Sequence, residues 1–443
     1  MTQATNQNDL VGQLLAGFQK FESQLNGATG SVHSLRKKAL ESLDLAGLPS
    51  TKHEEYKYTN ITKAIEKIFS FDTENTSTQI EPQEIEEFLI PGLDAHVLVF
   101  LNGVLDPSLS RWEAEAGLEI TDLPTALKED SEAISKHFAK YADYNRDAYV
   151  ALNTGFSKDG SFITVKANSI IEKPVVLHYI NVVKDGQVHN HPRNLVVVGE
   201  NSHATLIESF SNVGEHESLT NSVTEIVIGQ SARVDYYKLQ NDKENVYHVG
   251  TTQVQQAKNS YFAAYTFTTN GAITRNNLNI DLEDEGCESH MYGLYLLNGK
   301  THVDNHTAVD HQKPNSFSNE LYKGILEDKS RGVFNGKIFV RQDAQKTNAF
   351  QSNKNILLSD QATVNTKPQL EIWADDVKCS HGCTTGQLDE EALFYLQSRG
   401  LGKDNARALL LYAFAIEVLE NVKLEPVRKY LEDLISERLH KDF

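Results

Sequence analysis

The chain has 443 residues, enough for two to four domains, and its 42 basic and 61 acidic side chains leave a formal charge of −19. This charge repels phosphate groups, and the longest basic run is Arg36 to Lys38, so we expect neither a nucleic-acid nor an anionic-membrane partner. The longest apolar stretch, residues 408–419, is interrupted by Glu417 and is shorter than a membrane span.

The N-terminal residues and the cysteine content favour a cytoplasmic protein. The first fifteen residues lack the basic region of a secretory signal, and the first arginine is Arg36. The three cysteines, Cys287, Cys379 and Cys383, are too few for a disulfide framework in a chain of this length. We expect them to be free thiols or metal ligands.

Residues 1–145 are expected to form an N-terminal helical domain with a short strand segment. Apolar side chains recur at three- and four-residue steps from Leu10 to Leu25 and again from Val32 to Leu43, which is the spacing of two amphipathic helices. The apolar run at residues 96–103 predicts the strand, and more helix is expected from there to about Tyr144.

Residues 146–385 are expected to form one large β domain, because short β-branched segments bounded by turn residues replace the helical spacing. Similar turn-and-strand units begin at Gly199, Gly229, Ala257 and Gly286, roughly 28 to 30 residues apart. A constant period of strands too short to bury a face alone favours a parallel β-helix. A β-sandwich with Greek-key connections is the alternative.

Residues 386–443 are expected to form a C-terminal domain of three helices. The first helix is predicted to turn Leu393, Phe394 and Leu396 inward. Asp404 is predicted to cap the second helix, residues 406–422, whose nearly continuous apolar surface favours burial over a role in docking.

The segment from Gly293 to Thr301 resembles a phosphate-binding loop, but it does not fit one. Five residues instead of four separate Gly293 from Gly299, and no helix is predicted after Lys300 to receive a phosphate. We therefore expect no ATP hydrolysis by this chain.

Cys379, His381 and Cys383 form the densest group of soft metal ligands in the sequence. Their spacing of two places all three on one face of a strand, where the two thiols would be about 13 Å apart. Three ligands also leave a tetrahedral site incomplete, so a further ligand would have to come from elsewhere or from another chain. The alternative is a set of small residues at a corner of the β domain.

A second group of possible ligands contains His302, Asp304 and His306, which share one face of a predicted strand, and His311 follows them. This pattern fits a metal site with borderline ligands, but a polar ladder on a solvated sheet gives the same pattern.

The last third of the chain contains several ordered blocks that can be compared with known families. They are Glu320-Leu-Tyr-Lys-Gly-Ile-Leu, Ser330-Arg-Gly-Val-Phe-Asn-Gly, Gln351-Ser-Asn-Lys-Asn-Ile-Leu-Leu-Ser, Pro368-Gln-Leu-Glu-Ile, Asp375-Asp-Val-Lys-Cys-Ser-His-Gly and Thr385-Gly-Gln-Leu-Asp-Glu-Glu-Ala-Leu-Phe-Tyr-Leu-Gln-Ser-Arg-Gly. These blocks resemble the SufB/SufD family of iron–sulfur cluster assembly proteins. The Lys-Cys-Ser-His-Gly form is most like the SufD branch of that family.

The resemblance implies a right-handed parallel β-helix core flanked by N-terminal and C-terminal α-helical domains. It also implies a non-catalytic scaffold subunit of a SufB–SufC–SufD complex. Such a subunit pairs with SufB through the β-helix and with the SufC ATPase, where ATP is hydrolysed, through the C-terminal helices. The expected cofactor is a transient iron–sulfur cluster shared with SufB, with none tightly bound to the isolated chain. In the absence of SufB, the SufB-facing surface is expected to allow a homodimer.

The resemblance also assigns residues. His381 matches the family histidine proposed to complete a nascent cluster site with a SufB cysteine, and Cys379 matches the neighbouring family cysteine. Cys383 stands where the family often has Ala, so the resemblance gives it no role. Cys287 is expected to be a buried thiol, and the group around His302 is expected to pack in an interface. Two other hypotheses are a β-helix carbohydrate-active enzyme and a zinc-stabilised structural module.

Overall fold

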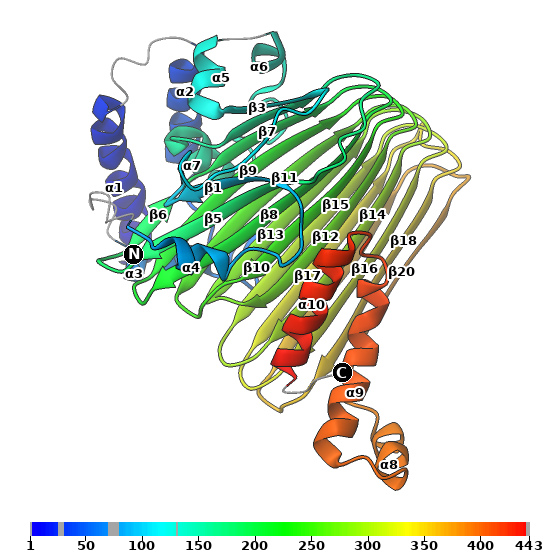
Figure 1. Cartoon of the computed structure of the whole chain (residues 1–443). Coiled ribbons are helices and arrows are strands. Elements are labelled where there is room, and N and C mark those ends of the chain that lie inside the picture. The colour runs from blue at the N-terminus through cyan, green and yellow to red at the C-terminus, as the bar shows by residue number, and fades with distance from the viewer. Residues whose placement is uncertain (1, 25–30, 70–78, 130–131, 440–443) are drawn as a thin grey trace.

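The computed structural model describes residues 2–24, 31–69, 79–129 and 132–439. The chain forms a parallel β-solenoid of about eight turns with helices at both ends (Figure 1). The predicted parallel β-helix is therefore confirmed, and the β-sandwich with antiparallel Greek-key strands is excluded, because all strands of the repeated coils pair in parallel.

Two sheets form the walls of the solenoid, and successive strands alternate between them. Sheet A contains, in spatial order, β2 (Val104–Leu105), β1 (His96–Leu101), β5 (Val175–Val183), β8 (His203–Gly214), β10 (Arg233–Asn241), β12 (Tyr261–Asn270), β14 (Glu288–Leu297), β16 (Phe317–Leu326), β18 (Asn348–Leu357) and β20 (Lys378–Gly386). Sheet B contains β19 (Thr363–Ile372), β17 (Arg331–Val340), β15 (His302–His311), β13 (Ile273–Leu282), β11 (Val246–Gln256), β9 (Ser218–Ile228), β7 (Arg193–Val198), β4 (Ser161–Val165) and β3 (Leu118–Asp122), with β6 (Val188–Asn190) beside β9.

The regular turn rhythm of the sequence corresponds to one corner of each coil. Asn201, Ser231, Asn259 and Asn315 have positive φ angles of 54° to 63° at this corner. Asn is well suited to this left-handed backbone conformation. Each corner N–H donates to a carbonyl of the next coil, as Asn201 does to Gln230 at 2.9 Å. The backbone ladder therefore continues around the corner and keeps the coil length nearly constant.

The lumen between the two sheets holds the main core. Ala204, Val234 and Phe262 occupy neighbouring rungs of sheet A and face the lumen. Further along the same strands the lumen becomes polar and includes the buried Glu208 and Lys238. Hydrophobic burial thus determines which face of each strand points inward. A row of buried polar side chains lies beside this apolar core.

Helices cover the outer faces of both sheets (Figure 1). They are α1 (Thr2–Gln24), α2 (Ser31–Ala46), α3 (Ile61–Ile68), α4 (Pro82–Glu86), α5 (Leu123–Glu129), α6 (Glu132–His137), α7 (Ala148–Phe156), α8 (Glu390–Ser398), α9 (Lys403–Leu419) and α10 (Glu425–Arg438), with a short 3-10 helix at Glu54–Tyr56. Helices α1, α2, α3 and α7 share a core with the outer face of sheet B, whereas α4, α9 and α10 pack on sheet A. None of the helices in the described ranges is long and apolar enough to cross a bilayer.

The C-terminal helices differ from the prediction in two details. Helix α8 buries no residue, and its Phe394 is 72% exposed, because α8 projects away from the solenoid (Figure 1). The prediction of an inward-facing side chain is therefore wrong for Phe394, whereas Leu393 and Leu396 are half-buried. Gly402, rather than Asp404, is the N-cap of α9. Helix α9 buries one face through residues such as Ala415, while Leu409 stays 38% exposed.

Candidate functional site

The candidate ligands lie on β20, the last strand of sheet A. Parallel pairing with β18 places Cys379 beside Ala349, His381 beside Gln351, and Cys383 beside Asn353. Because β20 is extended throughout and side chains alternate between faces, the three candidates share one face, as the sequence predicts.

That shared face points into the lumen. Cys379 packs against the buried cluster of Ile338, Val340 and Ala349, which fills this end of the solenoid. By alternation, His381 and Cys383 point to the same side, and both are exposed because no further coil covers them. An imidazole and a thiol are thus accessible at the open end of the lumen.

The three cysteines lie in different environments. Cys379 is half-buried and burial raises the pKa of its thiol, whereas Cys383 is exposed. Burial likewise raises the pKa of the Cys287 thiol, which donates to the carbonyls of Ala257 and Asp284, both at 3.2 Å. Cys287 is therefore a buried structural thiol, as expected. Within the described ranges no group of three His, Cys, Asp or Glu side chains is arranged to hold a metal ion.

The last coil has two free edges in the described chain. Strand β20 pairs with β18 and strand β19 pairs with β17, and neither has a neighbour on its other side. An unpaired strand edge offers a row of backbone N–H and C=O groups to another extended chain. His381 lies on one of these edges.

The second group of candidate ligands forms an ion-pair network instead of a converging metal site. The imidazole of His306 lies 2.9 Å from Asp304 and 3.4 Å from Glu55, and Arg275 lies 2.8 Å from Asp304. Thr59 contacts both His302 and Asp304. These contacts join the N-terminal segment 54–59 to the outer face of sheet B, so the expected interface packing occurs within the chain.

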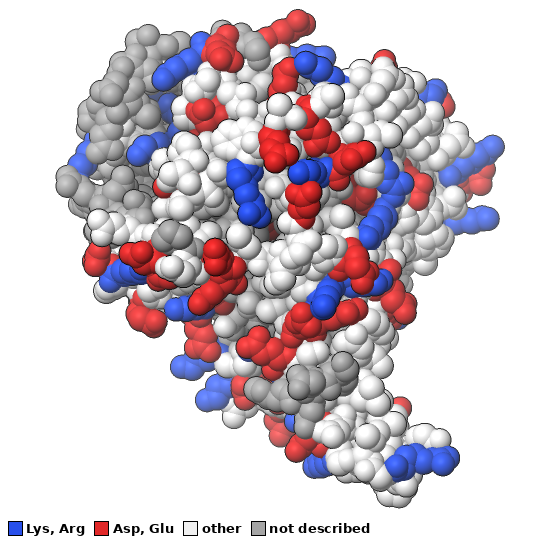
Figure 2. Space-filling view, viewed as in Figure 1, with Lys and Arg blue, Asp and Glu red and all other residues white. Residues whose placement is uncertain are grey.

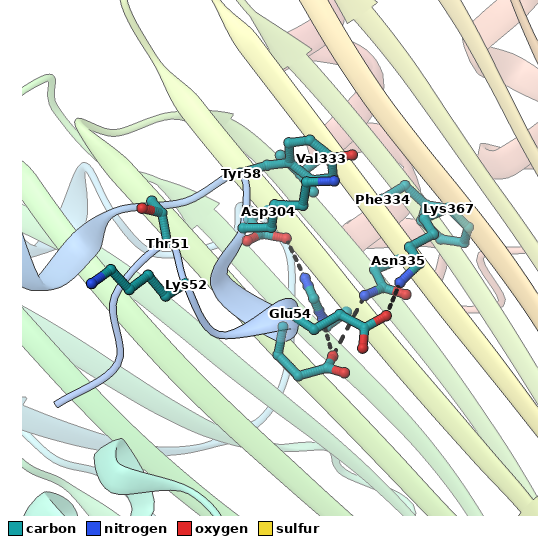
Figure 3. Close-up of a pocket in the computed structure, with 12 residues that line it drawn as sticks. Thr51, Lys52, Glu54, Tyr58, Asp304, Val333, Phe334, Asn335 and Lys367 are labelled. Carbon is teal, nitrogen blue, oxygen red and sulfur yellow. Dashed lines mark hydrogen bonds and ion pairs between the residues drawn. The ribbon is translucent and has the colours of Figure 1, made fainter. Parts of the chain in front are cut away.

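Figure 3 shows the pocket of about 390 Å³ beside this network, where Glu54 and Lys367 form an ion pair. Hydrogen bonds from His306 and Lys337 lower the pKa of Glu55 to about 2, even though partial burial acts in the opposite direction. The carboxylates here are therefore held in the ionised form by cations of the same chain, and they stabilise the docked segment.

His311, the remaining member of this group, points to the other side of the sheet. It is buried in the lumen, where a ring nitrogen lies 2.9 Å from the hydroxyl of Ser318. Burial lowers the pKa of His311 to about 3, so its ring is neutral at physiological pH. It lies apart from the ion-pair network because alternate residues of β15 face opposite sides.

Sequence reasoning misses two buried polar residues next to the candidate site. Glu320 on β16 and Gln351 on β18 occupy the two rungs before His381. Burial raises the pKa of Glu320 to about 7, and the hydrogen bond from Gln351 opposes this rise. Both residues belong to blocks that carry the family resemblance, but one sequence cannot reveal that their strands are neighbours.

Comparison with protein families gives the class of the molecule. The family described as "SUF system FeS cluster assembly, SufBD core domain" matches residues 180–414, and "SufBD protein N-terminal region" matches residues 11–177. The chain therefore belongs to the SufBD family of iron–sulfur cluster assembly proteins.

Individual relatives agree with this family. The chain is 31% identical to an iron–sulfur cluster assembly SufBD family protein of Synechocystis, over 98% of this chain and 97% of that protein. It is 31% identical to the iron–sulfur cluster assembly protein SufD of Escherichia coli, over 90% of this chain and 91% of that protein. The SufD of Bacillus subtilis is 26% identical over 92% of this chain. The resemblance found in the sequence blocks is confirmed.

Proposed function

We propose that this chain is a non-catalytic scaffold subunit that pairs with SufB through the open end of the solenoid. A nascent iron–sulfur cluster is built at that junction as the cargo of the complex, and His381 is one of its ligands. The observation that carries this proposal is an exposed imidazole on an unpaired edge strand. The molecule acts in the cytoplasm, in keeping with its three free cysteines.

The side chains on the β20 edge support a cluster whose ligands come from two chains. Imidazole is a borderline ligand for iron, and a cluster needs several thiolate or sulfide donors that His381 cannot supply alone. Cys379 stays a candidate ligand on the same face, although its half-buried thiol would have to turn away from the core cluster. A second chain that pairs with the β20 edge would bring its own cysteine next to His381.

The C-terminal helices support docking of a SufC-type ATPase. Helix α8 exposes Phe394 and Tyr395, 72% and 56% respectively, and the region that carries it is largely free of charged side chains on the face in Figure 2. Lys323 of β16 contacts Glu417 and the carbonyl of Phe414 on α9. A movement of the docked ATPase would therefore reach the strand that lies two rungs from β20.

The test is co-expression with candidate SufB and SufC, followed by anaerobic purification, for the wild type and His381→Ala. We expect the variant to form the complex but to retain little iron and sulfide. Thr385→Ala is the matched control, because Thr385 is exposed on the same face of β20. We expect this control to keep its cluster content.

Two results would contradict the proposal. Loss of the complex in His381→Ala would assign that residue to assembly instead of ligation. Normal iron and sulfide content in His381→Ala would remove it from the ligand set. The same comparison on Cys379→Ser tests the second predicted ligand.

A further inference from the structure

A row of three polar residues leads from the inside of the solenoid to its open end. Glu320, Gln351 and His381 are direct neighbours across β16, β18 and β20. Glu320 is 1% exposed and Gln351 is 3% exposed, whereas His381 is exposed. Because they hold the same position on adjacent parallel strands, their side chains lie on the same lumen-facing side of sheet A.

The amide of Gln351 is fixed in one orientation. Its Nε2 donates to Oε2 of Glu320 at 2.7 Å, and when Glu320 is ionised its carboxylate can only accept this bond. Gly336 on β17 makes room for this amide, because a Cβ at that position would be 2.0 Å from Nε2 of Gln351. With Glu320 ionised, a rotation that exchanged the amide oxygen and nitrogen would place two acceptors together. In the structure Oε1 is therefore the atom that does not contact Glu320.

That amide oxygen is buried and has no hydrogen-bond partner among the described residues. A buried acceptor left without a donor destabilises the folded state. The adjacent rung on the same face is His381, whose neutral ring carries one N–H donor and one acceptor nitrogen.

We propose that Gln351 is the positioning residue for His381. Its Oε1 accepts the N–H of one ring nitrogen, which fixes the tautomer and directs the other nitrogen out of the lumen. Glu320 keeps Gln351 in this orientation by accepting a hydrogen bond from the amide nitrogen. This inference rests on the proposed ligand role of His381, since a fixed tautomer is what a metal-binding imidazole requires.

The test reads the tautomer of His381 directly, in the isolated full-length chain. The wild type and the variants are labelled with 15N at histidine, of which the wild type has 16, and their NMR spectra are compared. The His381 signals are those that are missing from the spectrum of His381→Ala. We expect one dominant neutral tautomer in the wild type and a mixture of both in Gln351→Leu. Asn353→Leu is the control, because Asn353 is equally buried on the same strand but lies beside Cys383.

An unchanged tautomer in Gln351→Leu, or the same change in Asn353→Leu, would overturn the inference. If Gln351→Leu does not fold by circular dichroism, Gly336→Ala displaces the amide without removing it and should produce the same mixture. The NMR result does not depend on cluster assembly, so it can fail while the co-expression test of His381 succeeds. In the purified complex, loss of Gln351 is expected to weaken retention of iron against a chelator about 10- to 100-fold.

Discussion

Buried ionisable side chains link the stability of this solenoid to pH. Asp242 is the simplest case: it is 2% exposed, and neither carboxylate oxygen has a hydrogen-bond partner within the described chain. Burial raises the pKa of Asp242 to about 7. The folded state therefore holds a proton that the unfolded chain releases near pH 4, so this residue favours folding at low pH, and its contribution is lost as the pH rises through 7.

Replacement of this carboxyl should remove that pH dependence. The shift corresponds to roughly 4 kcal/mol in total, of which about 2 kcal/mol is lost between pH 5.5 and 8. We expect Asp242→Asn to be more stable than the wild type at pH 8, with a smaller difference at pH 5.5, when the free energy of unfolding in urea is measured at both values. Asp360→Asn, at an exposed turn, is the control; an identical pH trend in wild type and Asp242→Asn would contradict this account.

The candidate ligands illustrate what can be predicted at the scale of single residues. Alternation along a strand is sufficient to place Cys379, His381 and Cys383 on one face, and the structure agrees. Alternation cannot tell which face is covered, because that depends on the neighbouring strand and on the opposite sheet. The half-buried state of Cys379 and the neighbouring Gln351 therefore emerge only from the assembled coil.

At the scale of elements, a single carboxylate joins the N-terminal helices to the solenoid. Glu225 on β9 is fully buried, accepts from the backbone N–H groups of Ala139, Tyr141 and Ala142 at 2.9 to 3.0 Å, and pairs with Arg193 at 2.9 Å. The turn between α6 and α7 is therefore held by one side chain of sheet B.

Removal of this carboxylate should be costly. In Glu225→Ala the buried guanidinium of Arg193 loses its charge partner, so we expect a loss of about 3 to 5 kcal/mol in the free energy of unfolding. The ion pair of Lys166 with Glu119 is well exposed, and Lys166→Ala should change stability by less than about 1 kcal/mol. Urea denaturation followed by circular dichroism measures both; equal effects of the two substitutions would argue against a special role for Glu225.

The helices show where periodicity is a reliable guide and where it is not. The apolar spacing correctly predicts α1 and α2, which pack on the solenoid. The same spacing in α8 predicts an inward face that is only half-buried, because α8 projects beyond the sheets. Apolar periodicity indicates a face to be buried but does not say which chain buries it.

The molecule as a whole has two different ends. Helices pack against the first coils, whereas β19 and β20 end the solenoid with free edges. In a solenoid each coil is stabilised chiefly by its neighbours, so a coil with one neighbour opens more readily than a coil with two.

This asymmetry predicts a gradient in amide hydrogen exchange. In the isolated chain we expect the backbone amides of β20 to exchange at least tenfold faster than those of the central strand β11, since β11 is paired with β9 and β13. Mass spectrometry of exchanged peptides measures this difference. Uniform protection from β11 to β20 would mean that the last coil is already covered, for example by a second copy of the chain.

The repeated coil could be predicted from the sequence because its turns recur at a nearly constant spacing. The place of β1 could not, since this strand at residues 96–101 pairs with β5 across the predicted boundary near residue 145. A short apolar run predicts a strand, but its pairing partner is determined by the fold of distant segments.

The backbone hydrogen bonds that repeat at the corner of each coil also limit how the length of the solenoid can vary. Eight strands of sheet A, from β5 to β20, lie side by side, and at about 4.8 Å per strand they span roughly 34 Å. The distance between the N-terminal helices, which pack on the first coils, and His381 can therefore change only by whole coils. Loss or gain of a complete coil would preserve the inward and outward faces of every strand, whereas a single inserted residue within a strand would reverse them. Length variation that retains function should consequently come in units of about 30 residues.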